Sequence, residues 1–107
     1  MTFRVAQGHA QRHLRLIGEL DVAEADDLIE NVRSMVEPEG DLTLDLKALE
    51  FIDSSGVRAL VSIAGLLGDG ATLILSEPTG PVRRVLDLVG IEEVAAGIEV
   101  RPAAASG

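Results

Sequence analysis

The chain of 107 residues contains no cysteine, tryptophan or tyrosine, and its only aromatic residues are Phe3 and Phe51. Without cysteine it has no disulfide, no thiolate nucleophile and no zinc–cysteine site. With two aromatic rings it also lacks the stacking platforms on which single-stranded nucleic acids bind. Its longest apolar-rich run, Val57–Leu67, is too short to span a bilayer and is interrupted by Arg58 and Ser62. These absences exclude several classes of site and predict no membrane partner.

Positive charge is also scarce, because nine Lys and Arg residues stand against eighteen Asp and Glu, for a formal net charge of −9 at pH 7. Nucleic-acid binding needs clustered Lys and Arg, so we expect no nucleic-acid partner. The N-terminus, Met1–His9, lacks the apolar stretch of a signal peptide. The length and the 47% hydrophobic content fit one folded domain. We therefore expect a single cytoplasmic domain over residues 1–101 and a flexible tail over 102–107.

Apolar spacing predicts strands that alternate with helices, which favours a mixed or parallel sheet covered by helices. Three helices are expected. The first begins at Asp21, and the second extends over 54–67. The third begins with Pro81 at its first helical position and stops at Gly90, after which Ile91 packs back against the helix. The turns are expected at Gln7–Ala10, at Gly68–Gly70 and at Pro78–Pro81. The expected strands are Phe3–Val5, His13–Leu20, a run starting at Leu42 and reaching Ile52, Ala71–Leu75 and Ile98–Val100.

The first helix has a clear start signal. Asp21 is placed to cap the free amides of the first turn, and Glu24 completes a pattern like a capping box. Pro38 and Gly40 are expected to end this helix. One apolar stripe at helical spacing is expected to face the core: Val22, Ala25, Leu28, Ile29, Val32, Met35 and Val36.

The stretch Phe51–Gly56, Phe-Ile-Asp-Ser-Ser-Gly, places two hydroxyls where an apolar strand run ends and a helix begins. On that helix Leu60, Ile63, Ala64 and Leu67 form the face expected to meet the sheet. Ser55, Arg58 and Ser62 share the opposite side. Their neighbours there are apolar or small: Ala59, Val61, Gly65 and Leu66. Either another helix of the chain or a partner protein covers this side, and we favour a partner because the chain has only three expected helices.

Two interpretations of the serines compete. Capping by Asp53 or Ser54 alone is worth about 1 kcal/mol, and it accounts well for one polar residue and adequately for two, but not for a second serine on the same side as Arg58. A phosphate on this face would instead add a charge of roughly −1.5 to −2 beside the positive end of a helix. The fold should tolerate that charge, whereas an apolar partner surface would be repelled, with Glu50 and Asp53 adding to the repulsion.

Three segments together resemble the STAS domain, specifically the bacterial anti-sigma factor antagonists, and they extend over nearly the whole chain. They are Gly18-Glu19-Leu20-Asp21; Leu44-Asp45-Leu46 followed by Phe51–Val57; and Val82–Leu86 with Gly90-Ile91 downstream. The resemblance implies an α/β fold, a small mixed β-sheet of four to five strands with helices packed on it. It also implies no catalytic activity, no cofactor and no metal.

By position, the resemblance implies that Ser55 is the phosphoacceptor, with Asp53 and Ser54 beside it and Asp21 on a loop near the same surface. An unphosphorylated antagonist of this family binds an anti-sigma factor that is typically also a serine kinase, and a serine phosphatase reverses the modification. The expected partner-binding residues are Asp21, Asp53, Ser54, Ser55, Arg58 and Ser62. Lys47 stands where many relatives have a small polar residue, which should not disturb the site.

Other interpretations remain. A STAS domain also serves as a stressosome-like scaffold or as an accessory subunit of a lipid-transport system. An enzyme would use Ser55 as nucleophile with His9 or His13 as base, but the motif is not Gly-x-Ser-x-Gly and neither histidine has an evident orienting carboxylate. His9 and His13 have the spacing of a helical metal pair, which Gly8 and the following strand argue against.

Overall fold

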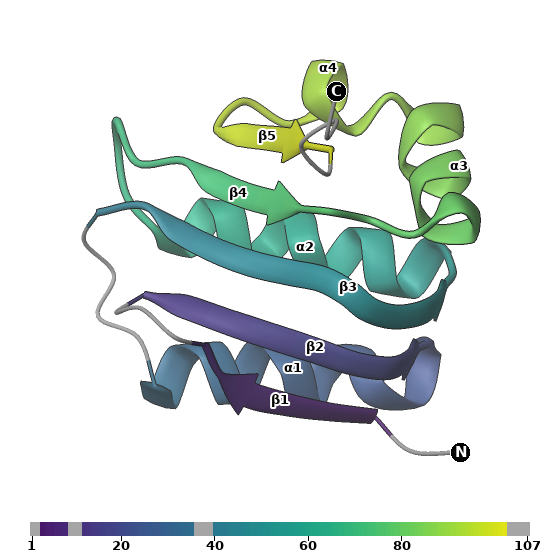
Figure 1. Cartoon of the computed structure of the whole chain (residues 1–107). Coiled ribbons are helices and arrows are strands. Elements are labelled where there is room, and N and C mark those ends of the chain that lie inside the picture. The colour runs from purple at the N-terminus through teal and green to yellow at the C-terminus, as the bar shows by residue number, and fades with distance from the viewer. Residues whose placement is uncertain (1–2, 9–11, 36–39, 103–107) are drawn as a thin grey trace, which may run out of the picture.

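The computed structural model describes residues 3–8, 12–35 and 40–102, which form a five-stranded sheet with helices packed on it (Figure 1). In chain order the elements are β1 (Phe3–Gln7), β2 (His13–Leu20), α1 (Val22–Met35), β3 (Leu42–Ile52), α2 (Ser54–Leu66), β4 (Leu73–Ser76), α3 (Gly80–Val89), α4 (Ile91–Val94) and β5 (Ile98–Arg101). The strands lie in the order β1-β2-β3-β4-β5. Because β1 is antiparallel to β2 and the other pairs are parallel, the predicted small mixed sheet is confirmed.

The two longest helices cover one face of the sheet. In Figure 1, α1 and α2 lie behind the strands, whereas α3 stands at one end of β3 and β4, and α4 lies beside β5. The core fills the space between the sheet and these helices, because every second residue of β2 from Leu14 onward is buried. Leu28 of α1 and Leu60 and Ile63 of α2 are fully buried against it, as the apolar spacing predicts.

Strand β3 carries two extra residues relative to β2, and they decide which side chains face the core. Arg15 and Ile17 of β2 pair with Asp45 and Ala48, and Gly18 and Glu19 pair with Leu49 and Phe51, so the register shifts twice. Each shift is a bulge that turns the following side chains to the other face. Leu42, Leu44, Leu46, Leu49 and Ile52 are buried, and Phe51 is exposed.

The structure differs from the sequence prediction at several boundaries. Strand β1 extends to Gln7, and β4 begins at Leu73 and runs to Ser76. Pro81 is the second residue of α3. The short helix α4 was not predicted. It starts after Gly90, whose left-handed backbone (φ 61°) ends α3, and Ile91 is buried behind it as expected.

The predicted core stripe of α1 is wrong at its first residue. Val22 is 72% exposed, because it starts the helix at the surface, whereas Ala25, Leu28 and Val32 are buried. The predicted stop of α1 near Pro38, most of the turn at 7–10 and the tail after Pro102 lie outside the described residues.

Candidate functional site

Two aspartates follow neighbouring parallel strands at the same edge of the sheet. Leu20 of β2 and Ile52 of β3 are partners in register, so Asp21 and Asp53 come next to each other. The amide of Asp53 also donates a hydrogen bond of 3.3 Å to the carbonyl of Leu20. This edge therefore brings together the starts of α1 and α2.

Each aspartate caps the helix that follows it. Oδ1 of Asp21 accepts from the amide of Ala23 at 3.0 Å, and Oδ1 of Asp53 accepts from the amide of Gly56 at 3.1 Å. The capping role predicted for Asp21 is confirmed, and at α2 the cap is Asp53. Glu24 donates its backbone amide to the carbonyl of Asp21 at 3.1 Å, but among the described residues its side chain accepts no hydrogen bond from the Asp21 amide, so the predicted capping box is only half formed. With Asp53 as the cap, both serines are left for another role.

Gly56 lets α2 start directly against the strand ends. An added Cβ at this buried position would lie 2.6 Å from Cγ1 of Ile52 and 2.8 Å from the carbonyl oxygen of Leu20. No side chain fits at those distances, so the third residue of the Ser-Ser-Gly run fixes where α2 sits. The depth of α2 in turn sets how far Ser54 and Ser55 stand above the sheet.

Ser54 and Ser55 differ in their surroundings. Ser54 is exposed, whereas Ser55 is half-buried and lies at one wall of an open groove of about 220 Å³ between the two helices. We call it the α1–α2 groove. Its lining residues are Val22, Ala25, Asp26 and Ile29 of α1 and Ser55, Arg58, Ala59 and Ser62 of α2. The predicted face of Ser55, Arg58 and Ser62 is therefore a real surface, and Ser55 is not sealed in the core.

The apolar outward face of α2 is partly covered by the chain itself. Ala59, expected on that face, is only 2% exposed because α1 packs alongside α2. Val61 and Leu66 are half-buried, and Gly65, Arg58 and Ser62 are exposed. The interpretation that another helix of the chain covers this side therefore holds for one flank, which α1 covers. The rest of the face is open, and a partner protein on it stays a prediction.

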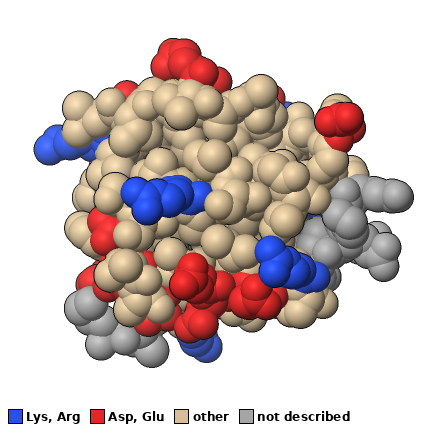
Figure 2. Space-filling model, turned by 180° about the vertical axis from the view of Figure 1, so that it is seen from behind, with Lys and Arg blue, Asp and Glu red and all other residues tan. Residues whose placement is uncertain are grey.

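The α1 side of the groove is acidic. Figure 2 shows the helix-covered side of the molecule, where Asp and Glu gather in the lower part, at the level of α1. The carboxylates of this helix are Glu24, Asp26, Asp27 and Glu30. Asp26 lines the groove opposite Ser55, whereas Asp21 and Asp53 do not line it but directly precede α1 and α2 at the strand ends. An anion at Ser55 would therefore meet several negative charges and, from its own helix, the cation of Arg58.

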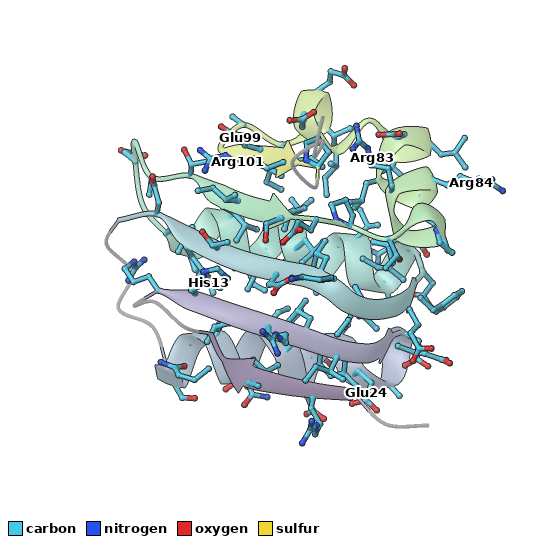
Figure 3. The ribbon with its side chains drawn as sticks, viewed as in Figure 1. His13, Glu24, Arg83, Arg84, Glu99 and Arg101 are labelled. Atoms are coloured by element: carbon cyan, nitrogen blue, oxygen red, sulfur yellow. The ribbon has the colours of Figure 1, made fainter. Side chains whose placement is uncertain are left out.

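The structure separates Ser55 from the histidine considered as its base. His13 begins β2, and Ser55 follows the opposite end of the paired strand β3, so the length of an eight-residue strand, roughly 25 Å, lies between them. Figure 3 shows His13 at one end of the sheet and Glu24, just after β2, at the other. His9 lies outside the described residues. A Ser55–His13 pair for acyl transfer does not form here.

The described residues contain neither a metal-ion cluster nor a membrane-spanning helix. Within the described ranges, no group of three or more His, Asp or Glu residues is placed to hold a metal ion. Over the same residues, no helix has the length and apolar character needed to cross a membrane.

Sequence reasoning missed the contribution of α1 to the site. Val22, Asp26 and Ile29 line the groove, but Val22 and Ile29 were assigned to the core stripe and Asp26 to no role. The three residues lie on one side of a helix at spacings of four and three, which is a signal the sequence contains. Only the packing of α1 beside α2 shows that this side faces Ser55.

The STAS domain family model matches residues 3–105. No match was found among curated protein sequences.

Among solved structures, an anti-sigma factor antagonist from Mycobacterium paratuberculosis is similar at 23% identity, with a TM-score of 0.74 over 96% of this chain and 86% of that one. The anti-sigma factor antagonist SpoIIAA in its unphosphorylated form gives 20% identity and a TM-score of 0.68 over 92% and 87%. The phosphorylated form of SpoIIAA from Bacillus gives 20% and 0.58 over 92% and 90%. At these identities the structures support the fold, while the family match extends over nearly the whole chain. The chain belongs to the STAS domain family.

Proposed function

We propose that this protein is an anti-sigma factor antagonist: it binds an anti-sigma factor with serine kinase activity when Ser55 is unmodified and is released when Ser55 is phosphorylated. A serine phosphatase restores the binding form. The main support is Ser55 itself, a half-buried hydroxyl at the wall of an open groove in a STAS domain. Solved relatives with this fold are anti-sigma factor antagonists, one of them in a phosphorylated form.

The partner-binding surface consists of Asp21, Asp53, Ser54, Ser55, Arg58 and Ser62. A partner that covers this surface has to remove water from Ser55. A phosphate there adds a charge of roughly −1.5 to −2, beside Asp26 and near Asp21 and Asp53, and desolvating that charge is costly. Binding and phosphorylation therefore exclude each other, while the helix cap made by Asp53 is unaffected.

The test has two arms. In the first, the unmodified protein and the variant Ser55→Asp are titrated against the cognate anti-sigma factor, and Ser55→Asp is expected to bind at least about tenfold more weakly, a difference of 1.4 kcal/mol. In the second, the protein is incubated with that kinase and ATP and its intact mass is measured. One added phosphate is expected for the unmodified chain and for Ser54→Ala, and none for Ser55→Ala. Equal affinities of the unmodified protein and Ser55→Asp in the first arm would contradict the proposed control of binding by phosphorylation.

A second candidate keeps the fold and changes the partner: a STAS scaffold of a stressosome-like assembly, or an accessory subunit of a lipid-transport system. The resemblance of the sequence to the STAS family is what keeps it open. A neighbouring gene for a GHKL-type kinase supports the antagonist, and one for a transporter supports the accessory subunit.

A further inference from the structure

Among the cations of this protein, Arg58, Arg4 and Arg84 make no ion pair with any described residue. Five others do: Arg15 with Asp45, Arg33 with Glu30, Lys47 with Glu77, Arg83 with Asp87 and Arg101 with Glu99. Arg58 is exposed on α2 in a protein that has twice as many acidic as basic residues. Asp26 lines the same groove and still does not pair with it.

Arg58 lies close enough to Ser55 to contact a group carried by that residue. The two residues are three apart on α2 and both line the α1–α2 groove. Side chains with this spacing are neighbours on a helix, with Cβ atoms about 5–6 Å apart. A guanidinium on so long a side chain reaches a phosphate carried by the Ser55 oxygen.

The other charges around Ser55 are negative. Asp26 faces it from α1, whereas Asp21 and Asp53 directly precede α1 and α2 at the strand ends. A phosphate on Ser55 would therefore share the groove with the carboxylate of Asp26 and the cation of Arg58, with two further carboxylates nearby at the starts of α1 and α2. Without the arginine, the nearby carboxylates would disfavour the doubly charged form of the phosphate and would also disfavour its location in the groove.

We propose that Arg58 is the counter-ion of phosphorylated Ser55, and that it holds the phosphate in the α1–α2 groove as a dianion. It is a positioning residue, distinct from the phosphoacceptor and from the cap. This inference rests on the proposed function only in taking Ser55 as the phosphorylated residue. The phosphate then blocks the groove itself as well as adding charge to the surface.

The experiment uses the full chain with phosphoserine placed at position 55 by genetic encoding, so no kinase or partner is needed. The ³¹P resonance of the phosphoserine is followed as a function of pH. Removing a neighbouring positive charge makes the dianion less favourable, so Arg58→Gln should move the titration midpoint to higher pH. For an exposed pair the expected shift is about 0.2–0.7 pH unit.

Arg84→Gln is the matched control, because Arg84 is an exposed arginine of α3 and does not line the α1–α2 groove (Figure 3). Its loss changes the net charge by the same amount without touching Ser55. Arg58→Lys keeps the positive charge, so the midpoint of its ³¹P titration should stay close to that of the parent protein. In 1 M salt the difference between Arg58→Gln and the parent should shrink, because the Debye length falls to about 3 Å.

A midpoint in Arg58→Gln that moves no further than in Arg84→Gln would overturn the inference. That outcome would leave the proposed function intact, since the partner titration with Ser55→Asp does not depend on Arg58. Conversely, a shift of the titration midpoint seen in Arg58→Gln but not in Arg84→Gln would support the counter-ion role of Arg58 even if Ser55→Asp bound the anti-sigma factor normally.

Discussion

The α-carbon of Gly56 faces the carbonyl oxygen of Leu20 so closely that a Cβ on Gly56 would lie 2.8 Å from it. The side chain of Ile52 closes the same space at 2.6 Å. The backbone of α2 thus touches the ends of β2 and β3 at the point where the two serines emerge. A glycine that looks like part of a phosphorylation motif is here a packing requirement.

Gly56→Ala is therefore expected to destabilise the fold by about 1–3 kcal/mol, because α2 or the strand ends must move to admit the methyl group. Gly65→Ala is the matched control on the same helix, since nothing lies within 4 Å of its added Cβ and the residue is exposed. It should be neutral or stabilise by up to about 1 kcal/mol. Urea unfolding of both variants measures the difference. Equal effects would show that the contact at Gly56 relaxes without cost.

Asp53 has two separable properties, its hydrogen-bond acceptor and its charge. Asp53→Ala should cost about 1 kcal/mol of folding free energy through loss of the cap to the Gly56 amide, while Asp53→Asn keeps an acceptor and should cost only a few tenths. Thermal unfolding separates the two. If Asp53→Asn is as unstable as Asp53→Ala, the charge rather than the acceptor stabilises the start of α2.

Val22 offers a way to probe the groove without disturbing the core. Because it is 72% exposed, Val22→Ser should change the folding free energy by less than about 0.5 kcal/mol. If the anti-sigma factor covers the α1–α2 groove, the same change should weaken binding at least about fivefold. Leu88→Ser is the control, because Leu88 is 80% exposed on α3, beside a different hollow. Similar losses of affinity for the two variants would count against the groove as the docking surface.

Phosphorylation of Ser55 is expected to leave the domain folded. The hydroxyl lies at an open groove and near the positive end of α2, so the modified protein should differ from the unmodified one by less than about 1 kcal/mol in unfolding free energy. Chemical denaturation of the protein with encoded phosphoserine tests this. A large loss of stability would mean that the modification acts by unfolding the domain.

Asp45 provides a test of the bulge in β3. It is 4% exposed, its Oδ1 accepts from the amide of Lys47 at 2.9 Å, and Arg15 lies 3.5 Å from Oδ2. Asp45→Ala leaves that amide without its acceptor and should cost about 1–3 kcal/mol, whereas Arg15→Ala removes an ion pair whose arginine is half-exposed, worth less than about 1 kcal/mol. If urea unfolding shows that Asp45→Ala and Arg15→Ala lose comparable free energy of unfolding, then the ion pair, and not the hydrogen bond from the Lys47 amide, provides the stabilisation.

Much of the fold follows from local sequence because its elements are periodic over several turns or residues. Strand β2 was predicted with its observed bounds, and the stop of α3 at Gly90 follows from the need for a left-handed residue there. The two bulges of β3 were not predictable. They depend on how β2 pairs with β3, and no local pattern records a register shift between two strands.

The candidate site divides in the same way. The sequence by itself determined the Asp-Ser-Ser-Gly junction and the shared side of Ser55, Arg58 and Ser62, because neighbours on one helix are fixed by its 3.6-residue turn. Only the tertiary structure decided that Val22, Asp26 and Ile29 form the opposite wall and that Asp21 stands beside Asp53. Those relationships arise from the pairing of two strands and the packing of two helices, which bring together residues about thirty positions apart in the chain.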